Sequence, residues 1–172
     1  MMMSALVAGG LEALTDSIRA ADEDNPKGYF ELEKVKGLEK DNSWLDDAKG
    51  KAVKIISALL KHLPGQHQYK IIFMRRNMNE VLASQRQMLI RRGEPTDAVS
   101  DERMAEMFRK HLRDVEAWLE RQPNAEVLYV SYNEAIDNPA SCIATVTSFL
   151  GGGLDTEKMA SAIDRKLHRQ RQ

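Results

Sequence analysis

The residues best suited to chemistry are Arg76 and Ser84, eight positions apart in the segment YKIIFMRRNMNEVLASQ, residues 69–85. Arginine presents a planar fork of donors that matches phosphate oxygens, and a serine hydroxyl adds a further donor. Close to the start of a helix, the helix dipole also favours an anion. The pair therefore predicts a phosphate site. The ordinary alternative, which spacing alone favours, is that Arg76 pairs with a nearby carboxylate and Ser84 faces solvent or a neighbouring helix.

Two elements are expected to position these side chains. The β-branched and aromatic run at the start of the segment is typical of a short buried strand, which we place at residues 69–74. Apolar residues then recur at helical spacing, which predicts a helix over 77–92 that begins at Asn77 and stops at Gly93. If Asn77 is the cap, Ser84 lies about 10 Å along the axis at ~1.5 Å per residue. A long guanidinium reaches back over that distance.

An arginine at the end of a strand, followed by R-N-x-x-E-V-x-x-S into a helix, resembles the 3′-phosphate-binding element of sulfotransferases that use 3′-phosphoadenosine 5′-phosphosulfate (PAPS). The resemblance implies that Arg76 and Ser84 hold the 3′-phosphate of the donor. The stretch VLYVSYNEAIDNPASCIATVTSFLG, residues 127–151, resembles a second family segment and implies that Tyr132 lies against the adenine. DEDNPKGYFELEKVKGL and LHRQR resemble a bacterial subgroup, so the similarity covers almost the whole chain.

The activity that this resemblance implies is transfer of a sulfuryl group from PAPS to an acceptor hydroxyl or amine. The expected partners are this nucleotide donor, used as a co-substrate, and an acceptor that the sequence does not identify. A non-catalytic binding or structural module derived from a sulfotransferase is the alternative. A P-loop nucleotide kinase is a third reading, but the G-x-x-x-x-G-K-[ST] pattern is missing.

One departure from the family pattern concerns the 5′-phosphosulfate. Family members open with a strand and a loop similar to P-R-S-G-T-S that holds this group, whereas residues 1–8 here predict the first helix, ended by Gly9 and Gly10. Losing one donor that stabilises a transition state commonly costs about a hundredfold to a thousandfold in rate. We therefore expect weak or no sulfotransferase activity from residues 1–172 alone. An assay of transfer from PAPS checks this, and measurable transfer would contradict it.

Sulfuryl transfer also needs a base for the acceptor hydroxyl. Cytosolic members place a catalytic histidine in a K-T-H-L-P run, and His62 stands in a similar run, but beyond the expected strand end at Ser57. The strand itself offers Lys54 and Ser57. Other branches use a glutamate, for which Glu31 in GYFE is the candidate. The favoured alternative for Glu31 and Lys54 is ordinary surface pairing.

Composition limits the remaining choices. The 172 residues suit one domain, 1–172, and the 25 basic and 26 acidic side chains nearly balance, which argues against bulk binding to nucleic acid or a membrane surface. The single cysteine, Cys142, excludes an internal disulfide, is expected to be a buried thiol, and favours a cytoplasmic setting. With one cysteine and no histidine at ligand spacing, no metal site is expected.

The order of elements predicts an α/β fold. Strands at residues 51–57, 69–74 and 126–131 alternate with helices, which implies a mainly parallel sheet in a three-layer domain with helices on both faces. Further helices are expected at 100–122, 138–150 and 155–164. The family's sheet is similar to that of P-loop kinases, here without its first strand. An open strand edge invites pairing between copies, so we expect homo-oligomers.

Overall fold

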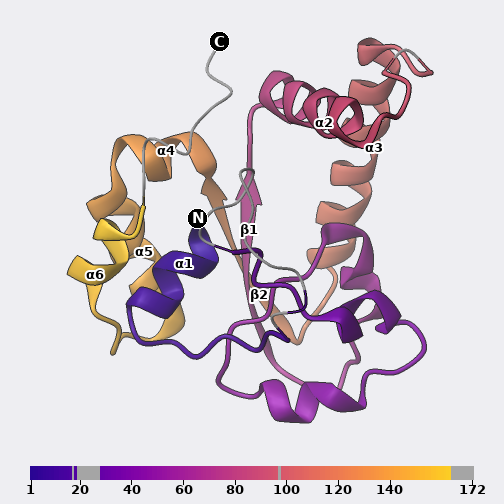
Figure 1. Cartoon of the computed structure of the whole chain (residues 1–172). Helices are drawn as coiled ribbons and strands as arrows, with labels where there is room; N and C mark the ends of the chain where they lie inside the picture. The colour runs from indigo at the N-terminus through magenta and orange to yellow at the C-terminus, as the bar shows by residue number, and fades with distance from the viewer. Residues whose placement is uncertain (17, 19–27, 97, 164–172) are drawn as a thin grey trace.

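The computed structural model describes residues 1–16, 18, 28–96 and 98–163. At its centre two strands run parallel, β1 (Tyr69–Arg75) and β2 (Ala125–Ser131), and their register aligns Arg75 with Ser131 at the carboxyl ends (Figure 1). The strands expected at 69–74 and 126–131 are therefore confirmed. Because both strands end at the same level, the residues that follow them emerge at one edge of the sheet.

Six α-helices and three short 3-10 helices surround the strands in the part of the chain that the structure describes. They are α1 (Met2–Ala8), η1 (Glu33–Gly37), η2 (Ser43–Ala48), η3 (Ser57–His62), α2 (Met78–Arg92), α3 (Asp101–Leu119), α4 (Tyr132–Asp137), α5 (Pro139–Leu150) and α6 (Thr156–Ser161). Asn77 caps α2 as expected, because its side-chain oxygen accepts the Asn79 N–H at 2.9 Å. The helix then ends at Gly93, whose φ of 68° is left-handed. The separate helix α4 was not predicted.

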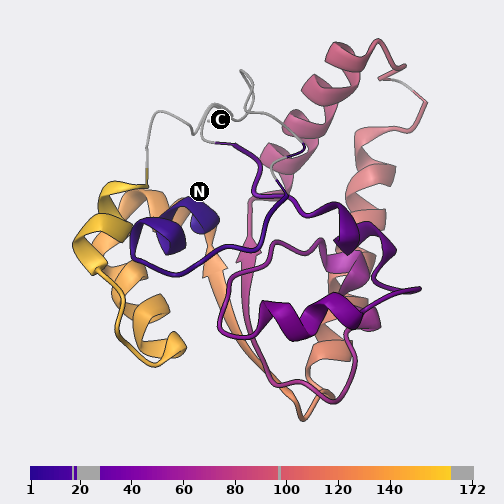
Figure 2. The same ribbon diagram turned by 60° about the horizontal axis from the view of Figure 1, so that its bottom comes forward.

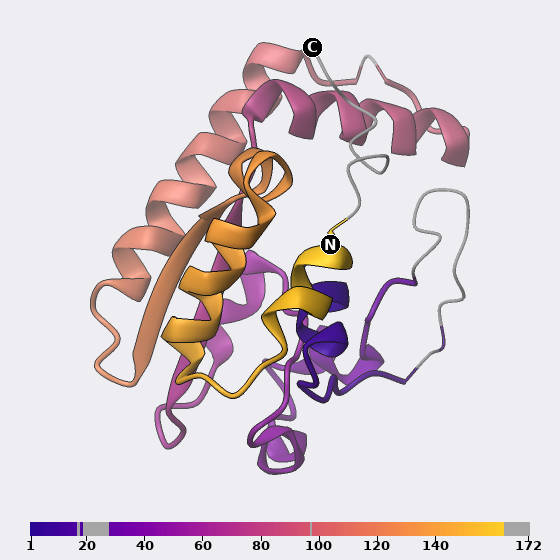
Figure 3. The ribbon, with the colours of Figure 1, turned by 90° about the vertical axis from the view of Figure 1, so that its left-hand side faces the viewer.

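The alternation of the strands divides the apolar side chains between two faces of the sheet. Ile72 and Met74 pack into a cluster with α1, α4, α5 and α6, whereas Phe73 packs with Leu60 of η3 and Leu119 of α3. Figure 2 shows the strands between these two groups of helices, and Figure 3 looks onto the group that contains α1, α5 and α6, with the strands behind it. Helices therefore pack against both faces of the strands.

The strand expected over residues 51–57 is not formed, so the prediction of about three strands was wrong for the described residues. One isolated parallel bridge joins Ala52 to Ala13, through Leu14 N–H to Ala52 O at 2.9 Å and Ala52 N–H to Glu12 O at 2.8 Å. Beyond it the chain forms no regular element up to Ile56, which is 60% exposed, and then enters η3. β-Branched residues favour a strand only where a neighbouring strand supplies hydrogen bonds and packing.

The contact between α1 and α6 requires a glycine at position 9. A Cβ on Gly9 would lie 2.4 Å from Cγ of Met159, which is fully buried, although the backbone at Gly9 is right-handed. Gly10, with φ of 98°, supplies the left-handed residue after α1.

We expect Gly9→Ala to lower the free energy of unfolding by about 1–3 kcal/mol, because the methyl group overpacks the α1–α6 contact. Urea denaturation measures the change. Gly37→Ala is the matched control, since a Cβ there meets nothing within 4 Å and the expected change is below about 1 kcal/mol. Equal effects of the two substitutions would contradict this explanation.

Candidate functional site

Arg76 and Tyr132 meet at the carboxyl edge of the sheet. Arg76 follows β1 and Tyr132 opens α4 directly after β2, so the parallel register brings them together. The central carbon of the Arg76 guanidinium lies 4.8 Å from the centroid of the Tyr132 ring, a cation–π contact. Burial raises the pKa of the Tyr132 hydroxyl, and the nearby Arg76 charge opposes that rise in part. At neutral pH the ring is therefore an uncharged, flat surface beside the cation.

A buried carboxylate holds Arg76 in place. Nε of Arg76 donates to Oε2 of Glu80 at 2.9 Å, and the side-chain amide of Asn133 donates to Oε1 of the same carboxylate at 2.9 Å. Glu80 is only 6% exposed. Burying a carboxylate is costly unless it is paired and hydrogen-bonded, and both partners are present here. Glu80 thus joins α2, α4 and the end of β1 at one point.

The pairing of Arg76 with a carboxylate was the ordinary alternative to a phosphate site, and the ion pair is indeed formed. It uses one edge of the guanidinium, because Nε donates the hydrogen bond to Glu80. Within the described residues, Nη1 and Nη2 of Arg76 donate no hydrogen bond. The ion pair therefore orients the side chain and still leaves four N–H donors for a ligand.

Ser84 lies on α2, one turn beyond Glu80 and so on the same helix face. It is exposed, and no hydrogen bond joins it to Arg76 in the described chain. The structure thus brings Arg76 and Tyr132 together, and it places Ser84 farther along α2 without a direct contact.

Arg75, the residue before Arg76, reaches the opposite face of the sheet. Nη2 of Arg75 lies 2.8 Å from Oε1 of Glu116 on α3, and its guanidinium carbon lies 4.0 Å from the centroid of the Tyr129 ring. Successive strand residues point to opposite faces, which explains why neighbouring arginines reach different partners. Arg75 is thereby engaged on the α3 side of the sheet.

The structure pairs two of the three catalytic candidates with each other. Nζ of Lys54 lies 3.3 Å from Oε1 of Glu31 and donates to the carbonyl of Tyr29 at 3.1 Å. Both side chains of the ion pair are more than a third exposed, which agrees with ordinary surface pairing. His62 closes η3, and no contact links it to Arg76 or Tyr132 in the described residues. Nothing in this arrangement assigns a catalytic base.

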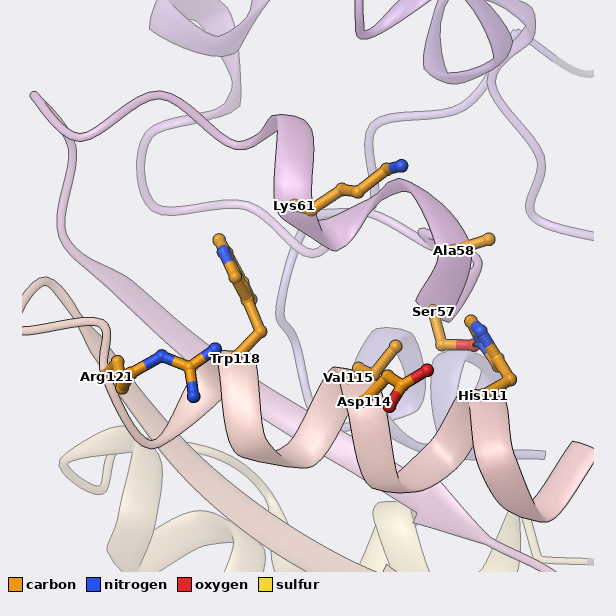
Figure 4. Close-up of a pocket in the computed structure, with 8 residues that line it drawn as sticks. All are labelled: Ser57, Ala58, Lys61, His111, Asp114, Val115, Trp118 and Arg121. Atoms are coloured by element: carbon orange, nitrogen blue, oxygen red, sulfur yellow. Dashed lines mark hydrogen bonds between the residues drawn. The ribbon is translucent and has the colours of Figure 1, made fainter.

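Sequence reasoning missed two sets of polar contacts, although it named Ser57 beside Lys54. Glu80 and Asn133 form the support of Arg76, and the acidic position in R-N-x-x-E was the available signal for Glu80. The second group is a pair between Ser57 Oγ and His111 Nε2, 2.8 Å apart, at a cavity of about 400 Å³ (Figure 4). No local sequence motif predicts that pair, because 54 positions separate its two residues.

Two expectations about reactivity can be compared with the structure. Cys142 is half-buried on α5, and burial raises the pKa of its thiol, so the thiolate needed for nucleophilic attack is disfavoured. Across residues 1–16, 18, 28–96 and 98–163, no three His, Cys, Asp or Glu side chains gather as a metal site would require. In the same residues no helix has the length and apolarity needed to cross a membrane.

Comparison with known proteins identifies the family. The family model described as the sulfotransferase domain matches residues 31–168, which includes β1, β2 and the site formed by Arg76, Glu80 and Tyr132. No curated protein and no solved structure matches the chain. A match over most of the chain shows membership, and the chain belongs to the sulfotransferase family.

Proposed function

We propose that this protein binds PAPS as a sulfuryl donor, with its 3′-phosphate at Arg76 and Ser84 and its adenine beside Tyr132. The reaction is transfer of the sulfuryl group to an acceptor hydroxyl or amine. The observation that carries the proposal is the guanidinium of Arg76, fixed through Nε by a buried carboxylate and laid over the Tyr132 ring.

The residues present fit the nucleotide in shape and charge. Two phosphate oxygens match the paired Nη groups of an arginine, and a flat ring beside them suits an adenine base. Ser84 adds an exposed hydroxyl on the face of α2 that carries Glu80. The N-terminal end of α2, capped by Asn77, contributes partial positive charge near the same edge.

In the proposed reaction the donor and the protein have separate roles. PAPS, when bound, supplies the sulfuryl group. Arg76 binds and orients the nucleotide through its 3′-phosphate, and Glu80 keeps the guanidinium in position. Glu31, Lys54 and His62 remain the candidates for catalytic roles on the acceptor side.

Nucleotide discrimination tests the proposal. Calorimetric titration with adenosine 3′,5′-bisphosphate and with adenosine 5′-monophosphate isolates the contribution of the 3′-phosphate. We expect the bisphosphate to bind at least about tenfold more tightly, since a charged hydrogen bond contributes about 1.5–3 kcal/mol. Equal affinities, or no binding of either nucleotide, would reject the 3′-phosphate site.

Three further expectations, on the fold, the cellular location and the oligomeric state, accompany this function. We propose a three-layer domain related to P-loop kinases, supported by helices on both faces of the parallel strands. A cytoplasmic setting is supported by the single cysteine.

Pairing between copies is supported by the shortness of the sheet, since each of its two strands has one partner strand in the described residues. Light scattering at high concentration tests the last point, and a clean monomer would reject it.

A further inference from the structure

The cavity between η3 and α3 shares no residue with the nucleotide site described above. Its volume is about 400 Å³, within the range of roughly 300–1,000 Å³ typical of small-molecule sites. Trp118 and Val115 at its wall pack against the cluster that contains Phe73, on the sheet face opposite the cluster that contains Tyr132. The cavity is therefore separated from the Arg76 site by the strands.

Charge in this cavity is unbalanced. Lys61 and Arg121 line it together with one carboxylate, Asp114, and within the described residues none of the three forms an ion pair. Two cations and one carboxylate thus line the cavity, which leaves a net positive charge for a ligand.

The Ser57–His111 pair supplies a donor whichever way its proton lies. If Nε2 of His111 accepts from the Ser57 hydroxyl, Nδ1 carries the remaining N–H; if Nε2 donates to Ser57, the serine hydroxyl is free to donate. Either arrangement leaves one neutral donor for a ligand. Figure 4 shows Ser57 and His111 facing each other at one end of the site, and Trp118 beside Arg121 at the other.

We propose that this cavity binds a small organic anion with a flat apolar body, such as an aromatic carboxylate. Trp118 offers a broad ring for the flat body, Arg121 and Lys61 attract the anionic group, and the Ser57–His111 pair donates a hydrogen bond. The site binds its ligand without PAPS, so the proposal stands apart from the nucleotide-binding function.

The two tryptophans make a test with an internal control. Benzoate is titrated into the full chain while the two indole N–H signals are followed by nitrogen-15 NMR, and Trp118→Phe assigns them. The Trp118 signal is expected to shift saturably. The Trp44 signal is expected to stay, because its indole is 3% exposed and donates to the Asp41 carbonyl at 3.2 Å. Benzamidine, which is flat but cationic, and acetate, which lacks the ring, are expected to give no saturable shift.

Variants then locate the anion. Arg121→Gln is expected to weaken benzoate binding about tenfold, as loss of a charged hydrogen bond implies, whereas Lys40→Gln at an exposed position leaves it unchanged. If Arg121→Gln does not fold, which its Trp44 signal would reveal, Lys61→Gln decides in its place. No saturable shift, joint movement of both indole signals, equal response to benzamidine, or unchanged affinity in the deciding variant would overturn the proposal.

Discussion

Replacing Arg76 with alanine is expected to weaken binding of adenosine 3′,5′-bisphosphate by about 2–3 kcal/mol, or roughly 30- to 150-fold. The substitution removes the two Nη groups that we assign to the 3′-phosphate. Affinity for adenosine 5′-monophosphate should change far less, because that nucleotide lacks the group. Calorimetry with both nucleotides measures the difference, and the variant should lose most of the discrimination seen in the wild-type chain.

Arg75→Ala is the matched control for this prediction. It removes the same side chain one position earlier, where the guanidinium pairs with Glu116 and stacks on Tyr129. We expect its affinity for the bisphosphate to stay within about twofold of the wild type, because an exposed charge farther from the ligand is screened by salt. Similar losses in both variants would mean that general positive charge, and not a defined site, attracts the nucleotide.

Glu80→Ala is expected to lower the free energy of unfolding by about 2–3 kcal/mol. The change leaves the amide of Asn133 without its acceptor and the guanidinium of Arg76 without its carboxylate, and buried groups that lose partners cost about 1–3 kcal/mol each. The expected loss of stability is smaller than the sum of these two costs, because the Arg76 side chain is 26% exposed and water replaces part of its lost hydrogen bonding. Urea denaturation measures the effect.

Glu116→Ala provides the comparison for Glu80→Ala. Its ion pair with Arg75 has the same chemistry, but the two side chains are 27% and 50% exposed, and such pairs contribute less than about 1 kcal/mol. We also expect Glu80→Ala to weaken bisphosphate binding, because Arg76 is no longer oriented. A Glu80 variant as stable as the Glu116 variant would show that the buried carboxylate does not support the fold.

Local patterns predicted the elements around the site well. The strand at 69–74, the cap at Asn77 and the stop at Gly93 all depend on residues close in sequence, and each is present. The strand predicted at residues 51–57 is not formed, and the reason lies in the tertiary structure. Their apolar run suits a strand, but hydrogen-bonded pairing ends after the bridge at Ala52, so the chain turns into η3.

The site itself was predictable only in part. The approach of Tyr132 to Arg76 follows from two parallel strands that end in register, and the sequence resemblance named both residues. The Arg76–Glu80 pair has a local spacing of four positions, but the contact of Asn133 with Glu80 spans 53 positions, which no spacing rule supplies. The Ser57–His111 pair is hidden for the same reason, since packing of η3 on α3 creates it.

The hydrogen bonds that Glu80 accepts from Arg76 and Asn133 have a consequence for how tightly an anion binds. A free arginine side chain has about 2 kcal/mol of rotamer entropy, which a ligand must ordinarily remove on binding. Here folding has already removed much of that freedom, because a buried carboxylate and an aromatic ring restrict the guanidinium before any ligand arrives. The site is therefore preorganised, and a phosphate meets its donors in place.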